Sequence, residues 1–172
     1  MNAKAKYILE IPITQADKNN IETIKNAQKS KCDIIGLKFN IKDNTETIEE
    51  AAKTLQGLLP YIEKPLMVRG SGDDSVDKRL LPALISELPY ECIIAHANEN
   101  TYKSIVPSII KGNHKLVIRT PIDINLCKEM NILVSDMGLA ADKIIIDTDI
   151  GGLGYGLEYG YSIMERIKIE AS

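Results

Sequence analysis

The sequence contains few of the residues that bind transition metals, with three cysteines and two histidines among 172 residues. Cys32, Cys92 and Cys127 lie far apart in apolar stretches and form no C-x-x-C pair. They therefore encode neither a disulfide framework nor a local iron–sulfur or zinc site, and we expect them to be small buried hydrophobic residues. His96 and His114 are not spaced as a pair on one helix face, which argues against a classical zinc site. We assign no metal ligand to this chain.

Long apolar runs and clusters of basic residues are also missing. No segment is long and apolar enough to span a bilayer, and the N-terminal stretch MNAKAKYILEIPI lacks the architecture of a signal peptide, so we expect a cytoplasmic protein without a membrane partner. The net charge is −3 and the lysines and arginines are scattered, which argues against nucleic acid as a partner. With 44% hydrophobic and 26% charged residues, the chain is expected to form one domain over residues 1–172.

Short apolar stretches alternate with amphipathic stretches along the chain. Strands are expected to start near residues 7, 33, 65, 91, 115 and 143, a spacing of 24–32 residues that is typical of βαβ units. Helices are expected over 18–30, 46–59, 77–88, 100–111, 123–138 and the C-terminal stretch. In the helix expected over 77–88, Pro82 is expected to place the start near Lys78 or later. Gly138 is expected to be the C-cap of the helix over 123–138. This alternation predicts an α/β fold with a parallel sheet that curls toward a (β/α) barrel of the TIM type, here with about six βα units.

Residues 143–169 carry the strongest signal. Ile144, Ile145 and Ile146 form a β-branched run that is typical of a strand buried on both faces. A polar DTD follows, then a glycine-rich loop, then an amphipathic helix. Such a loop at the carboxyl end of a parallel strand is where α/β proteins place binding chemistry, so we expect a ligand or an interface here rather than a merely structural turn.

The run GLGYGLEYGYSIMERIK in this segment resembles the small, barrel-shaped subunit of the corrinoid/iron–sulfur protein of the acetyl-CoA pathway, the delta subunit of archaeal acetyl-CoA decarbonylase/synthase. Arg69-Gly-Ser-Gly, Ala97-Asn98 and Asp123-Ile-Asn125 resemble three further signatures of that family, and Thr148-Asp149-Ile150 departs from its Pro-Thr-Thr. The matching positions in the last segment are Leu153, Gly154, Tyr155, Gly156, Glu158, Tyr159, Met164, Glu165, Arg166 and Ile167.

The family fold is an eight-unit barrel, so the resemblance implies that two units are missing from this incomplete or truncated barrel. The chain is then a fragment, or the sheet is open, or another chain completes it. Without the two units, the first and sixth strands would be exposed edges, which predicts self-association through them.

Residues that follow the expected strands have competing interpretations. The turn Gly70–Gly72 fits either a ligand that approaches its backbone amides or a turn that needs positive φ. Asn98 and Asn125 fit N-caps as well as ligand contacts. His96 fits a structural histidine better than a cobalt or metal ligand. The tyrosines near the C-terminus fit packing better than stacking on a cofactor.

Charged residues also end several strands. Arg69 and Arg119 fit ion pairs with Asp147 or Glu10, or a clamp on a carboxamide or carboxylate of a ligand. Asp147 fits an acid, a base or an acceptor for a pterin, and an ionised Asp149 beside it would repel it. No Ser or Cys shows a His and carboxylate pairing by motif, so we assign no catalytic residue.

Strand-end position and the resemblance together indicate a set of cofactor-binding residues. They are Gly70, Ser71, Gly72, Asp73, His96, Asn98, Thr120, Asp123, Asn125, Asp147, Thr148, Gly151, Gly152, Gly154 and Tyr155.

The resemblance implies a non-catalytic subunit that shields one face of a corrinoid (cobamide) at the interface with a large corrinoid/iron–sulfur subunit, which carries the iron–sulfur cluster. A tetrahydropterin-dependent methyltransferase and acetyl-CoA synthase would be transient partners in methyl transfer. The alternative is a pterin-binding barrel enzyme that resembles dihydropteroate synthase or methyltetrahydrofolate methyltransferases, with Asp147, Asn98, Asn125 and Asp123 on the pterin. A third reading is a structural fragment that contacts no cofactor.

Overall fold

The computed structural model describes residues 5–14, 19–41, 45–154 and 156–170. Six strands form one parallel sheet in the order β1-β2-β3-β4-β5-β6, and each is followed by a helix. The strands are β1 Ile8–Ile13, β2 Ile34–Phe39, β3 Leu66–Arg69, β4 Ile93–Ala97, β5 Lys115–Arg119 and β6 Ile144–Asp147. The helices are α1 Asn20–Gln28, α2 Thr45–Leu58, α3 Asp74–Ser86, α4 Tyr102–Gly112, α5 Ile124–Asp136 and α6 Leu157–Glu170, with short 3-10 turns at Leu59–Tyr61 and Ala141–Lys143.

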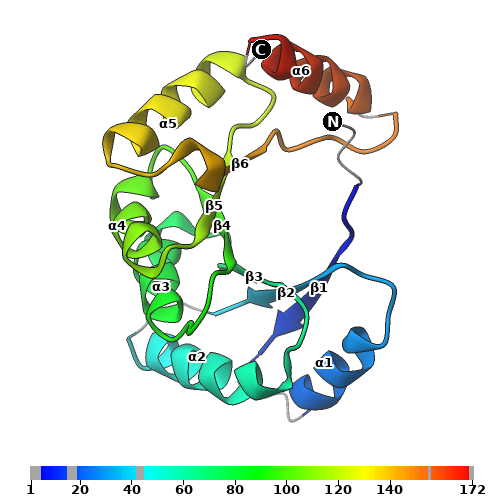
Figure 1. The fold of residues 1–172 in the computed structure, drawn as a ribbon, viewed down its shortest axis with the longest axis vertical. Helices are drawn as coiled ribbons and strands as arrows, with labels where there is room; N and C mark the ends of the chain where they lie inside the picture. Colours follow the sequence, from blue (N-terminus) through cyan, green and yellow to red (C-terminus); the bar gives the residue numbers. More distant parts are fainter. Residues whose placement is uncertain (1–4, 15–18, 42–44, 155, 171–172) are drawn as a thin grey trace.

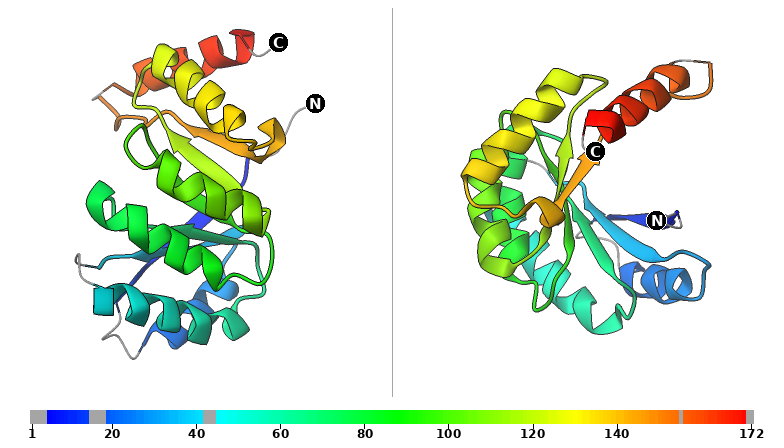
Figure 2. Two further views of the ribbon diagram at one scale, coloured as in Figure 1. Left: turned by 90° about the vertical axis from the view of Figure 1, so that its left-hand side faces the viewer. Right: turned by 45° about the horizontal axis from the view of Figure 1, so that its top comes forward.

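The sheet is curved, with helices along its convex side and an open concave side (Figures 1 and 2). In the sheet described, β1 and β6 lie at opposite edges and do not pair with each other. The prediction of a parallel, barrel-like α/β fold with about six βα units is therefore confirmed.

Alternation along the strands separates two apolar clusters. Convex residues such as Leu37 and Ile94 pack with helix residues such as Leu55 and Leu84 in the main core, and all four are inaccessible to solvent. The concave side of the central strands holds a smaller cluster. It comprises Ile34, Met67, Ala95 and Val117, with Ile93 and Ile145 packed against it. Because side chains alternate between faces along a strand, the next concave positions toward the carboxyl ends are those that form the candidate site.

The predicted start of α3 was wrong. The helix begins at Asp74 and contains Pro82 in its interior. Proline at this position removes only the backbone bond to the carbonyl four residues earlier, and the buried leucines of the helix, among them Leu80 and Leu84, stabilise the turns on either side. The helix α5 ends at Asp136 with Met137 as its C-cap, so Gly138, the expected cap, follows one residue later, where it has φ +98° and donates to the carbonyl of Ser135.

Among the described residues, no helix combines the length and the apolar character that crossing a membrane requires.

Candidate functional site

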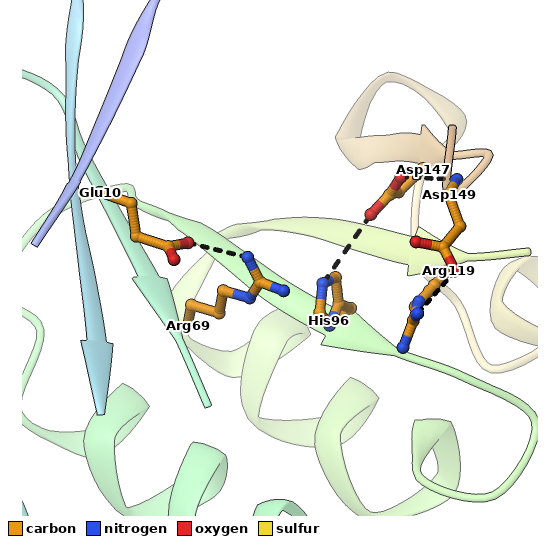
Figure 3. A network of polar contacts seen from close by, with 6 residues as sticks. All are labelled: Glu10, Arg69, His96, Arg119, Asp147 and Asp149. Atoms are coloured by element: carbon orange, nitrogen blue, oxygen red, sulfur yellow. Dashed lines mark hydrogen bonds and ion pairs between the residues drawn. The ribbon is translucent and has the colours of Figure 1, made fainter. Parts of the chain in front are cut away.

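The carboxyl ends of the six strands and the loops that follow them, here called the rim, lie at one end of the sheet. Five charged or titratable side chains from different strands point into the concave side there (Figure 3). They are Glu10 on β1, Arg69 on β3, His96 on β4, Arg119 on β5 and Asp147 on β6. The sequence therefore gathers a polar surface at the end of an otherwise apolar concave face.

Two ion pairs flank this surface. Arg69 Nη1 donates to Glu10 Oε2 at 2.8 Å, across the intervening strand β2. Gly36 on β2 lies beside Glu10 and has no side chain to separate the two. On the other flank, Arg119 Nη2 donates to Asp149 Oδ2 at 2.6 Å. These pairings settle one open point, because the partner of Arg119 is Asp149 rather than Asp147.

Asp147 and Asp149 do not simply repel each other as the sequence suggested. The backbone amide of Asp149 donates to Asp147 Oδ1 at 2.9 Å, and Asp149 adopts a left-handed φ of +53°. The turn thereby directs the Asp149 carboxylate away to Arg119, while the second oxygen of Asp147 faces His96 (Figure 3). Each of the two carboxylates has a donor of its own.

His96 occupies the centre of the rim. The β4–β5 register shifts between Ala95 and Ala97, and such a bulge re-aims the side chain within it. His96 Nε2 lies 3.8 Å from Asp147 Oδ2, and only 13% of the side chain is exposed. Burial lowers the pKa of His96, and the positive charges of Arg69 and Arg119 lower it further, against the opposing effect of Asp147. The imidazole is therefore neutral at pH 7.

The Gly70–Gly72 turn is held by hydrogen bonds to a buried side chain of the same chain, Asp77. Asp77, which is 5% exposed, accepts hydrogen bonds from the Ser71 amide at 2.7 Å, the Ser71 hydroxyl at 2.9 Å and the Gly72 amide at 2.9 Å. A Cβ on Gly70 would lie 2.5 Å from the Asp77 carboxylate, so only glycine fits there. Of the two interpretations left open for this turn, the hydrogen bonds favour the structural one, because the amides of Ser71 and Gly72 fix the shape of the loop.

Two further predicted residues cap helices. Asp73 accepts from the amides of Ser75 and Val76 at the start of α3, and Asp123 accepts from those of Asn125 and Leu126 at the start of α5. The cap of α5 is thus Asp123, so the interpretation of Asn125 as an N-cap is wrong. The Asn125 side chain is exposed on the first turn of α5.

Asn98 joins two neighbouring loops of the rim. Its Oδ1 accepts from the amides of Asn100 and Thr101, which open α4, and its Nδ2 donates to Asp74 at 2.8 Å. Asn100 Nδ2 donates to the other oxygen of Asp74 at 2.8 Å. The first residue of α3 therefore ties the β3–α3 loop to the β4–α4 loop. Acidic residues in a first helical turn are a recognisable signal, but this long-range link to two asparagines has none.

The last two loops of the rim are also joined. The Thr120 amide donates to the Asp147 carbonyl at 2.8 Å, and the Ile122 amide donates to the Thr148 carbonyl at 3.0 Å. Both threonines are buried, at 0% and 5% exposure. Thr120 and Thr148 therefore hold the rim together from beneath and do not line its surface.

The glycine-rich loop lies between β6 and α6. Gly151 is half-buried, whereas Gly152 and Gly154 are exposed, and Gly154 needs its φ of +78°. Tyr155, the remaining predicted residue, lies outside the described residues. Tyr159 and Tyr161 are 63% and 59% exposed and do not pack in the core.

A pocket of about 550 Å³ lies at the opposite, amino ends of the strands, where Ile34, Leu66 and Ile93 line it. Cys92 also lines it, and burial together with the charge of Glu91 raises the pKa of its thiol to about 12. The protonated thiol is a poor nucleophile. Among the described residues, no three His, Cys, Asp or Glu side chains lie together in a way that could hold a metal ion.

Comparison with known proteins identifies the family. A family model described as CO dehydrogenase/acetyl-CoA synthase delta subunit matches residues 10–172. The chain belongs to this family. Similar curated proteins include acetyl-CoA decarbonylase/synthase complex subunit delta 2 of Methanosarcina acetivorans, which is 31% identical over 96% of this chain. Subunit delta of Methanosarcina mazei is 31% identical over 96% of the chain, and that of Methanocaldococcus jannaschii is 31% identical over 75%.

The match covers 41% of the length of the two Methanosarcina relatives and 32% of that of the Methanocaldococcus protein. The chain thus spans about two fifths of the delta subunits that it matches over most of its own length. The family resemblance read from the sequence is confirmed.

Proposed function

We propose that this chain is a non-catalytic part of an acetyl-CoA decarbonylase/synthase complex, in which its rim covers one face of a corrinoid cofactor held by a larger iron–sulfur subunit. The family match over residues 10–172 carries this proposal, since relatives with that match are named as delta subunits of the complex. When bound, the corrinoid would supply the cobalt that accepts and releases the methyl group. The chain itself would bind, orient and exclude water.

The rim fits a ligand with many amide groups at its periphery. Arginine guanidinium groups offer donors, and Asp147 and Asp149 offer acceptors, on a surface whose loops are already held by internal hydrogen bonds. A surface fixed in advance loses little conformational entropy on binding. Gly152 and Gly154, in the exposed glycine-rich loop that follows β6, would add further contacts.

The alternative, a pterin-binding enzyme, is less well supported. That reading needs the side chains of Asp147, Asn98, Asn125 and Asp123 on the pterin. Asn98 and Asp123 instead bind helix-start amides, and of the four only Asp147 belongs to the charged network that points into the concave side (Figure 3). The geometry therefore favours shielding over catalysis.

The proposal is tested by purifying the chain at native abundance without oxygen. We expect a corrinoid absorbance band to co-elute, together with a cysteine-rich iron–sulfur protein identified by mass spectrometry. The methyltransferase and acetyl-CoA synthase would join only transiently. A colourless protein without partners would contradict the proposal, and binding of free tetrahydropterin by the isolated chain would then favour the enzyme.

A matched pair of glycine substitutions separates rim contact from general damage. A Cβ on Gly152, in the glycine-rich loop, and one on Gly57, on α2, each meet nothing within 4 Å, and neither position needs positive φ. Gly152→Trp places a bulky side chain on the rim and is expected to abolish co-elution of the corrinoid. Gly57→Trp is expected to leave it unchanged. Equal behaviour of the two variants would remove the rim from the interface.

A further inference from the structure

Two arginines flank His96 on the concave side of the rim. Arg69 on β3 and Arg119 on β5 lie on the two strands that border β4 (Figure 3). Adjacent strands are 4.7–4.9 Å apart, so the two backbones are separated by roughly 10 Å across the sheet. Side chains as long as arginine can converge over that distance on a group placed above His96.

Each guanidinium retains donor capacity. In the described part of the chain, Arg69 donates through Nη1 to Glu10 and Arg119 through Nη2 to Asp149. A guanidinium carries five N–H groups in a planar fork that matches carboxylate and phosphate oxygens. Both pairs are more than a third exposed, and such pairs contribute little to stability. An incoming anion can therefore share these donors or replace the carboxylates.

Charges of both signs lie on the rim. On the strands themselves, the basic side chains Lys38, Arg69 and Arg119 come from β2, β3 and β5, and the acidic side chains Glu10 and Asp147 come from the edge strands β1 and β6, while the loops and helix starts add Asp73, Asp74, Asp123 and Asp149. Burial contributes most to the lowered pKa of His96, the positive charges of Arg69 and Arg119 lower it further, and the negative charges of Asp147 and Asp77 raise it. The groups whose charges act on His96 are Arg69, Asp77, Arg119 and Asp147, from β3, α3, β5 and β6. Two arginines that flank a half-buried imidazole offer an anion several N–H donors at once.

We propose that Arg69, His96 and Arg119 form a binding site for an oxyanion, the phosphate or carboxylate group of a small molecule. The arginines bind its oxygens, and His96 contributes an N–H when the bound charge favours the imidazolium. This site lies on the same rim that is proposed to cover the corrinoid. It does not depend on that proposed function, because the isolated chain binds the anion without a corrinoid or a partner.

The two histidines make the site directly observable by nuclear magnetic resonance. His96 reports on the rim, and His114 serves as an internal control, because it is 1% exposed and its Nδ1 accepts from the Cys92 amide. Inorganic phosphate and acetate are titrated separately into the full chain, with sodium chloride at matched ionic strength as the reference. We expect a saturable shift of the His96 ring protons and a rise in the His96 pKa, with no change at His114.

The two probes distinguish the source of the oxyanion. Saturation by phosphate alone supports a phosphate group, saturation by acetate alone supports a carboxylate, and saturation by both supports a general oxyanion site. If neither probe exceeds the effect of sodium chloride, the proposal is wrong. Failure to bind either anion would not contradict the corrinoid proposal. Conversely, a protein that is purified colourless and without partners but still binds phosphate would contradict the corrinoid proposal and support the oxyanion site.

Charge-neutralising variants assign the binding to the arginines. Arg69→Gln and Arg119→Gln each remove a charge-assisted contact and are expected to weaken the binding by about tenfold or more. Lys53→Gln removes the same charge from an exposed position on α2 and is expected to have no effect. Unfolding in urea confirms that each variant is folded. Unchanged affinity in both folded arginine variants would overturn the assignment.

Discussion

Asp77 is the residue that most clearly defines the shape of the rim. Its buried carboxylate accepts three hydrogen bonds from the Ser71–Gly72 turn, and no other acceptor is recorded for those donors in the described residues. Asp77→Asn replaces one carboxylate oxygen with an NH₂ donor that faces N–H and O–H donors. Since bonds to a charged group contribute about 1.5–3 kcal/mol, we expect a loss of about 2 kcal/mol in the free energy of unfolding, measured in urea.

The same substitution has a second readout at His96. The negative charge of Asp77 raises the His96 pKa, so its removal should lower that pKa further. Asp142→Asn, at an exposed position in the turn before β6, is the matched control and should change neither quantity. Wild-type stability in Asp77→Asn would mean that the turn holds its shape without this carboxylate.

Residue-level roles were the hardest to predict from the sequence. The strand-end rule correctly placed His96 and Asp147 at the rim, because strand position determines the face and the end on which a side chain lies. It could not distinguish residues that contact a ligand from N-caps such as Asp73 and Asp123, because both kinds of residue lie between the end of a strand and the start of the next helix. The links from Asp77 and Asp74 escaped notice because Pro82 displaced the expected start of α3 beyond both.

At the scale of elements, the start of α3 couples stability to pH. Hydrogen bonds from the Ser75 hydroxyl, the Ser75 amide and the Val76 amide lower the pKa of Asp73. A carboxyl whose pKa is lower in the folded state stabilises the fold fully above its unfolded pKa, near 3.9, and loses that contribution as the pH falls through the folded value. Asp73→Asn retains a capping oxygen but cannot titrate.

We therefore expect the unfolding midpoint in urea to fall less between pH 5 and pH 3 in Asp73→Asn than in the wild type. Asp136→Asn, which removes an exposed carboxylate at the other end of a helix, should retain the wild-type dependence on pH. An equal fall in all three proteins would show that the Asp73 cap does not contribute to acid unfolding.

Elements were predicted well where local chemistry decides them. The β-branched run gave the correct position of β6, because such side chains favour an extended backbone, although its isoleucines are half-buried and not buried on both faces as expected. Gly138 lies just beyond α5, where a positive φ favours glycine. Pro82 misled because the cost of one missing helix bond is offset by the burial of Leu80, Leu81 and Leu84 in the same helix, and that burial depends on the tertiary structure.

At the scale of the whole molecule, the two edges of the sheet have the composition of interior strands. On β1, Ile8 and Leu9 point to opposite faces and are 46% and 39% exposed, and the isoleucines of β6 are only half-buried. Parallel strands are normally covered on both faces. An exposed edge with apolar side chains on both faces pairs readily with another chain, so the predicted self-association through the edges remains the expectation for the isolated chain.

Leu9→Lys tests this expectation, because a lysine on an edge strand opposes pairing with a second edge. Sedimentation velocity over a wide range of protein concentration should show association of the wild type and a shift toward monomer in the variant, with an unchanged urea midpoint because Leu9 is partly exposed. Ile132→Lys introduces the same charge at a 60% exposed position on a helix, α5, and not on an edge strand, and should associate like the wild type. A wild type that is monomeric throughout, or two variants that dissociate alike, would mean that the edges are not the contact.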